Sequence, residues 1–162
     1  MLTSFIVGSD LSGHFQRRRT AKMIDAMKNH TIVCGTGLMA NAVVERLMRE
    51  RLQVVLIDSD NDRLTAMKEK YRRLEVICGG PTDELVLATA NVVNARHVVA
   101  APDSDVDILL IGITCKDPGH KISVIAESND MALANRMRKA GIDEVVSTSQ
   151  LGGERVTELI MG

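Results

Sequence analysis

Two glycines, an alanine and an aspartate stand at the spacing of a turn that binds dinucleotides. The pattern is Gly35-x-Gly37-x-x-Ala40, and Asp58 follows about 20 residues later. Gly35 permits a tight exit from a strand, and Gly37 lets a pyrophosphate approach the backbone because glycine has no Cβ atom. The unpaired N–H groups that open the next helix, together with the helix dipole, favour a bound phosphate.

Asp58 indicates which nucleotides this turn would take. Its carboxylate can accept hydrogen bonds from both hydroxyls of a ribose, and it would repel a ribose 2′-phosphate. Asp60 and Asp62 add to that repulsion, although Asp60 can also cap the next helix. The sequence therefore favours NAD or an adenosine nucleotide over NADP. The alternative is a glycine turn that binds no ligand.

The elements that must position these residues alternate along the chain. Strands are predicted at residues 31–34, 54–58, 74–78, 97–101, 122–126 and 144–147. Helices are predicted at residues 38–50, 60–70, 83–90, 106–115 and 131–140. By pattern alone the apolar run 106–115 could be a strand or a helix. Its length and a cap at Asp103 or Ser104 favour a helix.

This alternation predicts the α/β class, with a doubly wound, six-stranded parallel sheet. A ligand then binds in the crevice at the carboxyl ends of the strands. Thr82 is placed to cap the helix at 83–90.

Composition limits the classes of partner. The chain has 162 residues, of which 45% are hydrophobic, enough for the core of one domain. Its formal net charge of −1 gives no long-range attraction toward nucleic acid or a membrane surface. Tyr71, Phe5 and Phe15 are the only aromatic residues, too few for a platform that stacks single-stranded bases. No nucleic-acid partner is expected.

The three cysteines form no paired spacing, which indicates a reducing cytoplasm. Cys34 and Cys78 end predicted strands that face the crevice, where buried apolar side chains are favoured over redox-active thiols. No metal-spaced cluster occurs, so no metal is expected. The apolar residues 2–7 are far fewer than the roughly 20 of a membrane-spanning helix. Because the positive charges follow this cluster, it is not a signal peptide.

Five short segments together resemble the TrkA-N domain, the amino-terminal half of the regulator of potassium conductance (RCK) domain. The segments are residues 34–37, 57–58, 79–83, 101–105 and 126–127. The resemblance covers residues 29–149 and implies a Rossmann domain. It also implies pairing through a crossover helix after the sixth strand, to which residues 150–162 are similar, and assembly into a homodimer or a cytoplasmic ring. Such rings gate potassium channels or serve potassium uptake systems.

Residues 1–28 carry Arg17-Arg18-Arg19 and a helical run with Ile24 and Met27 on one face. They resemble the linker that follows the pore helix of a channel, which favours a channel over an uptake subunit. The alternative is a solvated basic helix start. If the linker interpretation holds, the chain is a fragment of a channel or an internally initiated product. It would then lie in the cytoplasm at the inner face of the cell membrane, held there through a pore domain.

The resemblance also implies binding roles. Those of the pyrophosphate loop fall on Gly35, Thr36, Gly37, Leu38 and Met39. Asp58 would hold the adenosine ribose, Cys78 and Gly79 would border the adenine, and Ala101 and Asp103 would lie near the distal half of a dinucleotide. Glu127 could meet a ligand ribose or amide, or pair with a cation across a dimer.

Some channels of this family bind calcium with acids at the positions that Gly80 and Asn129 occupy here, so no such site is expected. The expected function is a nucleotide-sensing regulatory domain of a potassium channel or transporter that binds NAD, ADP or ATP. The alternative is an NAD-dependent oxidoreductase domain, which usually needs a second domain for its substrate. The four histidines are expected to be surface or structural residues, so no enzyme activity is expected. They are His14, His30, His97 and His120.

Overall fold

Six parallel strands form one sheet in the computed structural model, which describes residues 2–116 and 121–162. The strands are β1 (Thr31–Cys34), β2 (Val54–Asp58), β3 (Glu75–Cys78), β4 (His97–Ala100), β5 (Ser123–Glu127) and β6 (Glu144–Val146). Their order in the sheet is β3-β2-β1-β4-β5-β6. Successive strands are added on one side of β1 up to β3 and on its other side from β4 to β6, so the strand order reverses between β1 and β4. The predicted doubly wound parallel sheet is confirmed, and its crevice lies at that reversal.

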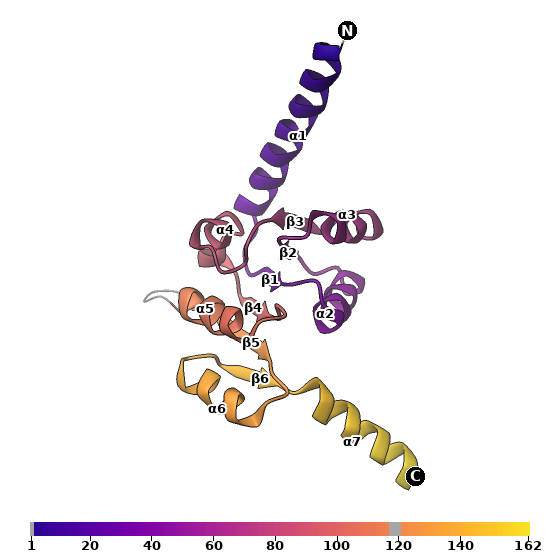
Figure 1. Cartoon of the computed structure of the whole chain (residues 1–162), viewed down its shortest axis with the longest axis vertical. Coiled ribbons are helices and arrows are strands. Elements are labelled where there is room, and N and C mark those ends of the chain that lie inside the picture. Colours follow the sequence, from indigo (N-terminus) through magenta and orange to yellow (C-terminus); the bar gives the residue numbers. More distant parts are fainter. Residues whose placement is uncertain (1, 117–120) are drawn as a thin grey trace.

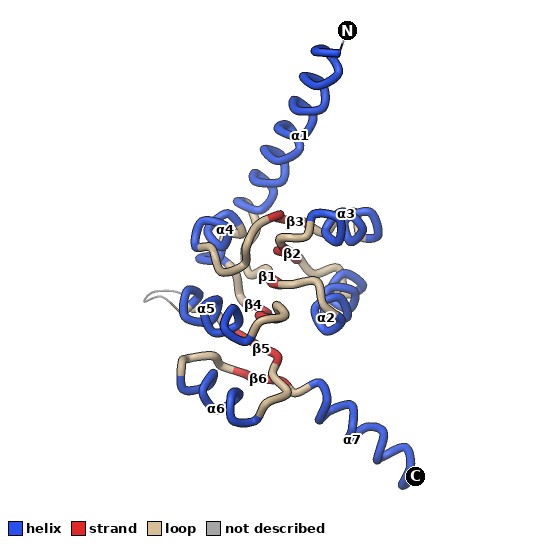
Figure 2. The backbone as a smooth tube through the Cα atoms, in the orientation of Figure 1, coloured by secondary structure: helices blue, strands red, loops and turns tan. Residues whose placement is uncertain are grey.

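Seven α-helices accompany the sheet within the described residues. They are α1 (Leu2–Asp25), α2 (Leu38–Arg49), α3 (Asn61–Lys70), α4 (Glu84–Thr89), α5 (Asp105–Cys115), α6 (Met131–Lys139) and α7 (Thr148–Met161). Figure 1 shows α2 and α3 on one face of the sheet and α4, α5 and α6 on the other. The helices α1 and α7 project from opposite ends of this layered body, and Figure 2 shows the strands between the two helical layers.

Alternation along the central strands divides the core into two clusters. Ile32 on β1 and Ile57 on β2 pack toward α4, α5 and α6, whereas Val33 and Leu56 pack toward α2 and α3. All four side chains are buried, as expected for parallel strands that are covered on both faces. The sheet is therefore a rigid base for the loops at its carboxyl edge.

Side-chain caps define where most helices begin. Ser104 caps α5 by accepting a hydrogen bond from the Asp107 amide, so the run predicted as a helix is one. The prediction that Thr82 caps α4 is wrong. The Asp83 carboxylate takes that place and accepts from the Leu85 amide at 2.8 Å. A carboxylate caps well because it also interacts favourably with the helix dipole.

The end of the first segment belongs to the core. The helix α1 stops at Asp25, and Ile24 and Met27 are both buried against the cluster that includes Leu87 of α4. The Asn91 amide donates to the carbonyls of Ile24 and Met27 at 3.1 and 3.2 Å. The base of α1 is therefore fixed to the body of the domain.

Among the described residues, no helix is both long enough and apolar enough to cross a bilayer.

Candidate functional site

A cavity of about 200 Å³ opens at the carboxyl edge of the sheet, where β1 and β4 diverge. Six of the residues predicted to bind a nucleotide line it, namely Gly35, Thr36, Gly37, Asp58, Ala101 and Asp103. Six others that were not predicted also line it, namely Ser59, Arg63, Pro81, Pro102, Ser104 and Asp107. Residues from the ends of β1, β2 and β4 thus meet in one place.

The first glycine of the turn is required by the fold. Gly35 has a φ of +105°, which L side chains rarely adopt, and its amide donates to the Ile57 carbonyl at 2.8 Å. A Cβ atom added there would lie 2.8 Å from the carbonyl carbon of Ala101. The absence of a side chain at Gly35 therefore lets the backbone after β1 lie against the backbone after β4.

The second glycine is not required by the fold. Gly37 has a φ of −69°, which any residue can adopt, and an added Cβ would meet only the Asp103 carboxylate, at 3.9 Å. The space beside its Cα atom is open toward the cavity. This space lets another molecule approach the backbone closely.

The helix that follows the turn begins without a cap side chain. No side chain accepts a hydrogen bond from the first turn of α2, whereas α3, α4, α5, α6 and α7 each begin with an Asp or Ser cap. Their N-caps are Asp60, Asp83, Ser104, Asp130 and Ser147. The first N–H groups of α2, at Leu38 and Met39, therefore retain their capacity to donate to an anion.

Asp58 holds the turn in place. Its two oxygens accept hydrogen bonds from the Thr36 hydroxyl and from the Asp60 amide, each at 2.8 Å. The Asn41 side chain also donates to the Thr36 carbonyl, at 3.0 Å. A carboxylate offers about four acceptor positions, so Asp58 can still accept from two ribose hydroxyls.

Arg63 supplies a positive charge that the sequence analysis missed. It lies in the first turn of α3, lines the cavity and pairs with Asp60 at 3.3 Å. In the sequence, only the position of Arg63 three residues after Asp60 could have indicated that it lines the cavity. The same spacing is equally typical of an ion pair on the surface of a helix. Asp58, Asp103 and Asp107 line the same cavity. Among the described residues, the lining therefore combines one positive charge, Arg63, with several carboxylates that can accept hydrogen bonds.

Four predicted residues lie beside the cavity without lining it. The Leu38 side chain is 94% exposed, and Met39 packs against the α2 side of the core. Cys78 pairs in register with Asp58 on the neighbouring strand, and its thiol is exposed, so its interpretation as a buried side chain is wrong. A Cβ at Gly79 would lie 2.7 Å from the Val86 side chain, so packing against α4 explains this glycine.

Glu127 contacts a helix within the same chain. Its carboxylate accepts a hydrogen bond from the Thr148 hydroxyl at 2.6 Å, which ties the end of β5 to the first turn of α7. Asn129 accepts from the Ser147 hydroxyl at 3.1 Å and from the Ser149 amide at 3.0 Å. The start of α7 is therefore anchored at the edge of the sheet where the cavity lies.

Three other chemistry-bearing side chains, Cys34, Cys115 and His30, are buried in the core. Burial raises the pKa of the Cys34 thiol well above its ordinary value and raises that of Cys115 to about 11. Burial lowers the pKa of His30, whose ring contacts the Ala90 carbonyl at 2.8 Å. His120 lies outside the described residues. Within residues 2–116 and 121–162, no three His, Cys, Asp or Glu side chains gather as a metal site would require.

The sequence model of the TrkA-N domain matches residues 31–148, from the first strand to the start of α7. The chain belongs to the TrkA-N domain family. The glycine turn, Asp58 and the ends of β4 and β5 described above all lie within the matched part of this TrkA-N domain.

Known proteins similar to this TrkA-N domain include potassium channels and uptake proteins. It is 25% identical to potassium channel protein 1 of Methanocaldococcus jannaschii, over 98% of this chain and 47% of the channel. It is 24% identical to the Trk system potassium uptake protein TrkA homolog of Archaeoglobus fulgidus, over 79% of this chain and 29% of that protein. The chain thus spans less than half the length of either relative.

Solved structures share the fold. The TrkA-N domain resembles the GsuK channel bound to NAD with a TM-score of 0.67 and 24% identity, over 75% of this chain and 22% of the channel chain. It resembles the GsuK structure bound to ADP with a TM-score of 0.68 and 24% identity, over 76% of this chain and 32% of that one.

Proposed function

We propose that this TrkA-N domain senses a nucleotide and thereby regulates a potassium channel or transporter. The observation that carries the proposal is the open, uncapped turn at Gly37. Its backbone is accessible to an anion, and a half-buried carboxylate, Asp58, lies beside it in the same cavity. This arrangement suits a pyrophosphate that is followed by a ribose.

The ligand class is NAD or an adenine nucleotide such as ADP or ATP. The backbone of residues 35–39 would hold the phosphates, Asp58 the ribose, and Cys78 and Gly79 the border of the adenine. Ala101 and Asp103, on the β4 side of the cavity, would face the distal part of a dinucleotide. The GsuK structures bound to NAD and to ADP, which share this fold, support the same class.

A channel is favoured over an uptake subunit as the regulated protein. The similarity to potassium channel protein 1 extends over 98% of this chain, whereas the similarity to the TrkA homolog covers 79%. Because the family match begins at residue 31, the additional channel similarity includes residues of α1. In the proposed setting, α1 leads to a pore domain and the TrkA-N domain lies at the inner face of the membrane.

Regulation would proceed by a shift between two arrangements of paired domains. A ligand moves such an equilibrium only by binding one arrangement more tightly than the other. The helix α7 is suited to the pairing because it is exposed along its length and its first turn is tied to β5. Changes at the carboxyl edge of the sheet can therefore reach the partner through α7.

An oxidoreductase is disfavoured by the chemistry of the cavity. Within the described residues, the polar side chains that line it are aspartate, serine, one threonine and one arginine, with no His, Lys or Tyr. Hydride transfer usually requires a proton donor beside the nicotinamide. The relatives described above are, by their names, channel and uptake proteins.

Calorimetric titration with NAD, NADH, ADP and ATP tests the proposal, with light scattering and nicotinamide absorbance recorded on the same samples. The proposal expects saturable binding of at least one nucleotide by a dimer, without change in nicotinamide absorbance. Absence of binding by all four nucleotides would contradict nucleotide sensing. Reduction or oxidation of the nicotinamide would instead support the oxidoreductase.

A further inference from the structure

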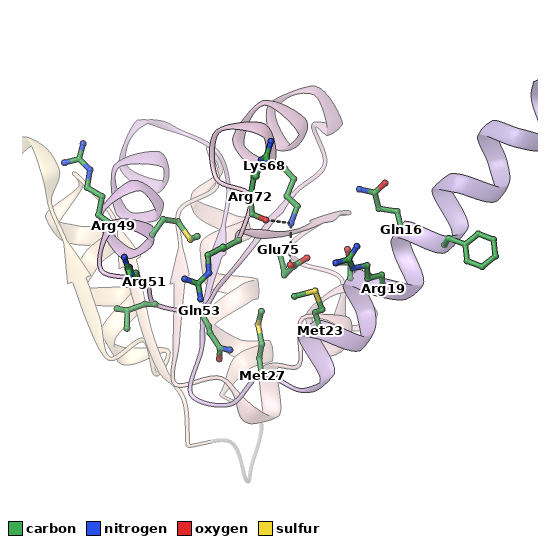
Figure 3. A pocket seen from close by; sticks show the side chains of 15 residues that line it. Gln16, Arg19, Met23, Met27, Arg49, Arg51, Gln53, Lys68, Arg72 and Glu75 are labelled. Atoms are coloured by element: carbon green, nitrogen blue, oxygen red, sulfur yellow. Dashed lines mark hydrogen bonds and ion pairs between the residues drawn. The ribbon is translucent and has the colours of Figure 1, made fainter.

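A second and larger cavity lies at the opposite edge of the sheet, where the strands begin. Its volume is about 1120 Å³, slightly above the roughly 300–1,000 Å³ that is typical of small-molecule sites. Its walls come from α1, from the turn between α2 and β2, and from the turn between α3 and β3. Figure 3 shows Arg19 of α1 on one side and Arg49 and Arg51 on the other, with Met23 and Met27 between them. We refer to this cavity as the basic groove.

The basic groove concentrates positive charge. Among the described residues, those that line it with a positive charge are Arg19, Arg49, Arg51, Lys68, Arg72 and Arg73, and only Glu75 is acidic. The whole chain has 20 basic and 21 acidic residues, so this excess is local. A local excess of one sign at a concave surface attracts ligands of the opposite sign.

Two of the six cations are already engaged. Arg49 pairs with Glu45 at 2.7 Å. Lys68 pairs with the buried Glu75 at 3.4 Å and also donates to the Arg72 carbonyl at 3.1 Å, so it fastens α3 to β3. Among the residues that the structure describes, no carboxylate pairs with the other four, namely Arg19, Arg51, Arg72 and Arg73.

Arg51 occupies a position that backbone geometry alone would assign to glycine or asparagine. It follows the end of α2 with a φ of +58°, in the left-handed region where a long side chain is disfavoured. The local backbone therefore gives no advantage to an arginine here. Arg51 lines the basic groove together with the other three unpaired arginines.

We propose that the basic groove binds an anion that carries two or more phosphate groups. Four unpaired guanidinium groups around one cavity are neutralised by two doubly charged phosphates, whereas an acidic peptide would need four carboxylates in the same volume. Arginine also binds phosphate through two parallel hydrogen bonds. Such phosphates come either from a free oligophosphate or from the phosphorylated headgroup of a lipid. The site is separate from the glycine turn and does not depend on the function proposed there.

Inorganic tripolyphosphate is the probe that tests this site. Titration is followed by calorimetry and by the backbone amide resonances of Leu52 and Gln53, in the wild type and in Gly37→Val. The second protein removes competition from the glycine turn. Both proteins should bind, and both amides should shift.

Two charge-matched double variants locate the binding. Arg51→Asn combined with Arg72→Gln removes two groove cations, and asparagine suits the left-handed backbone at position 51, so the fold should be kept. Arg136→Gln combined with Arg155→Gln removes two exposed arginines that do not line the groove. The groove variant should lose roughly ten- to a hundredfold in affinity, and the control should match the wild type.

Equal affinities in the wild type and the groove variant would overturn the proposal, and so would equal losses in both double variants. Absence of tripolyphosphate binding would also overturn it. A sedimentation assay then distinguishes the two sources. Vesicles of phosphatidylcholine with a phosphoinositide should bind the wild type but not the groove variant if the ligand is a lipid headgroup. Tripolyphosphate binding without vesicle binding identifies a free anion.

Discussion

Gly35 and Gly37 are glycines for different physical reasons. Gly35 has a left-handed backbone pressed against Ala101, so the protein itself requires it. Gly37 has an ordinary backbone and open space, so the fold does not require a glycine there. The motif alone does not separate these two cases. The proposed phosphate contact is a reason for glycine at position 37 that does not apply at position 35.

Asp58 combines support of the turn with a free capacity to accept hydrogen bonds. Replacing it by alanine should weaken nucleotide binding by roughly 1–3 kcal/mol, because a charged acceptor to two hydroxyls is lost. Asp58→Asn is the matched control for the turn, since its amide oxygen can accept from the Asp60 amide while its NH2 group donates to the Thr36 hydroxyl. Calorimetry measures the affinity and urea unfolding the stability. Unchanged affinity in Asp58→Ala would exclude the ribose contact.

His30 makes the stability of the fold sensitive to pH. Burial lowers the pKa of its imidazole below the ordinary 6.5, so the unfolded chain takes up a proton more readily than the folded one. Its contribution is fully present above pH 6.5 and is lost as pH falls below that value toward the folded-state pKa.

The urea midpoint should therefore fall from about pH 7.5 to about pH 5.5 in the wild type, and less so in His30→Gln. Glutamine cannot titrate but can still donate to the Ala90 carbonyl. Parallel pH dependence of the two proteins would show that other groups cause the change.

Sequence reasoning at the residue scale worked where a motif tied a residue to a strand end. Gly35, Gly37 and Asp58 converge because adjacent parallel strands end at the same edge. It did not foresee the contact of Glu127 with Thr148, because the two residues are far apart along the chain. It also could not show that Gly79 packs closely against α4, because such packing favours the same residue type as a ligand contact does.

Among the elements, α7 is held at its first turn by Asn129 and by one hydrogen bond to a strand residue, Glu127. The Thr148 hydroxyl donates to the Glu127 carboxylate, and no residue of α7 is fully buried. Thr148→Val should therefore loosen the first turn of α7 by about 1–2 kcal/mol, because a hydrogen bond to a charged group is lost. Hydrogen exchange at the amides of Leu151 and Gly152 measures this loosening.

Thr157→Val is the control for this loss, because its hydroxyl bonds only to the Gly153 carbonyl within the same helix. The exchange of the first turn should stay at the wild-type rate in that variant. Equal exchange in Thr148→Val and Thr157→Val would show that the Glu127 contact does not hold the helix.

The alternation of strands and helices was predictable from the sequence. The helix caps and the contacts between distant elements were less so. Helices and strands were located because buried parallel strands are short apolar runs bounded by turns. The cap of α4 was predicted at Thr82 but is Asp83. Both residue types cap helices and the two are adjacent in the chain, so the sequence could not separate them. The base of α1 packs into the core through hydrogen bonds from Asn91, which is distant from it along the chain. Local sequence patterns do not show such a contact.

Across the whole molecule, α7 projects from the body of the domain (Figure 1) and carries apolar side chains that are exposed. Val156, Leu159 and Ile160 follow the spacing of one helical face, and each is more than half exposed. An apolar helix face of this kind indicates a partner. A second copy of the chain is the partner that the proposed function requires.

Leu159→Glu should convert the dimer into a monomer, since a charge would be buried in the pair. Light scattering over a range of concentrations measures the mass. Gln150→Glu, which adds the same charge to a polar position of the same helix, should leave the dimer intact. A wild type that is monomeric at all concentrations would contradict pairing through α7.

The most direct test of nucleotide sensing compares ADP binding by the wild type and by Gly37→Val in the calorimeter, with urea unfolding of both proteins. Among the described residues beyond its two chain neighbours, only the Asp103 carboxylate lies within 4 Å of the added Cβ position, so the variant should fold with wild-type stability. The valine should block the phosphates and abolish binding. ADP binding that persists in a folded Gly37→Val protein would contradict this expectation, because the phosphates could not then lie on the turn.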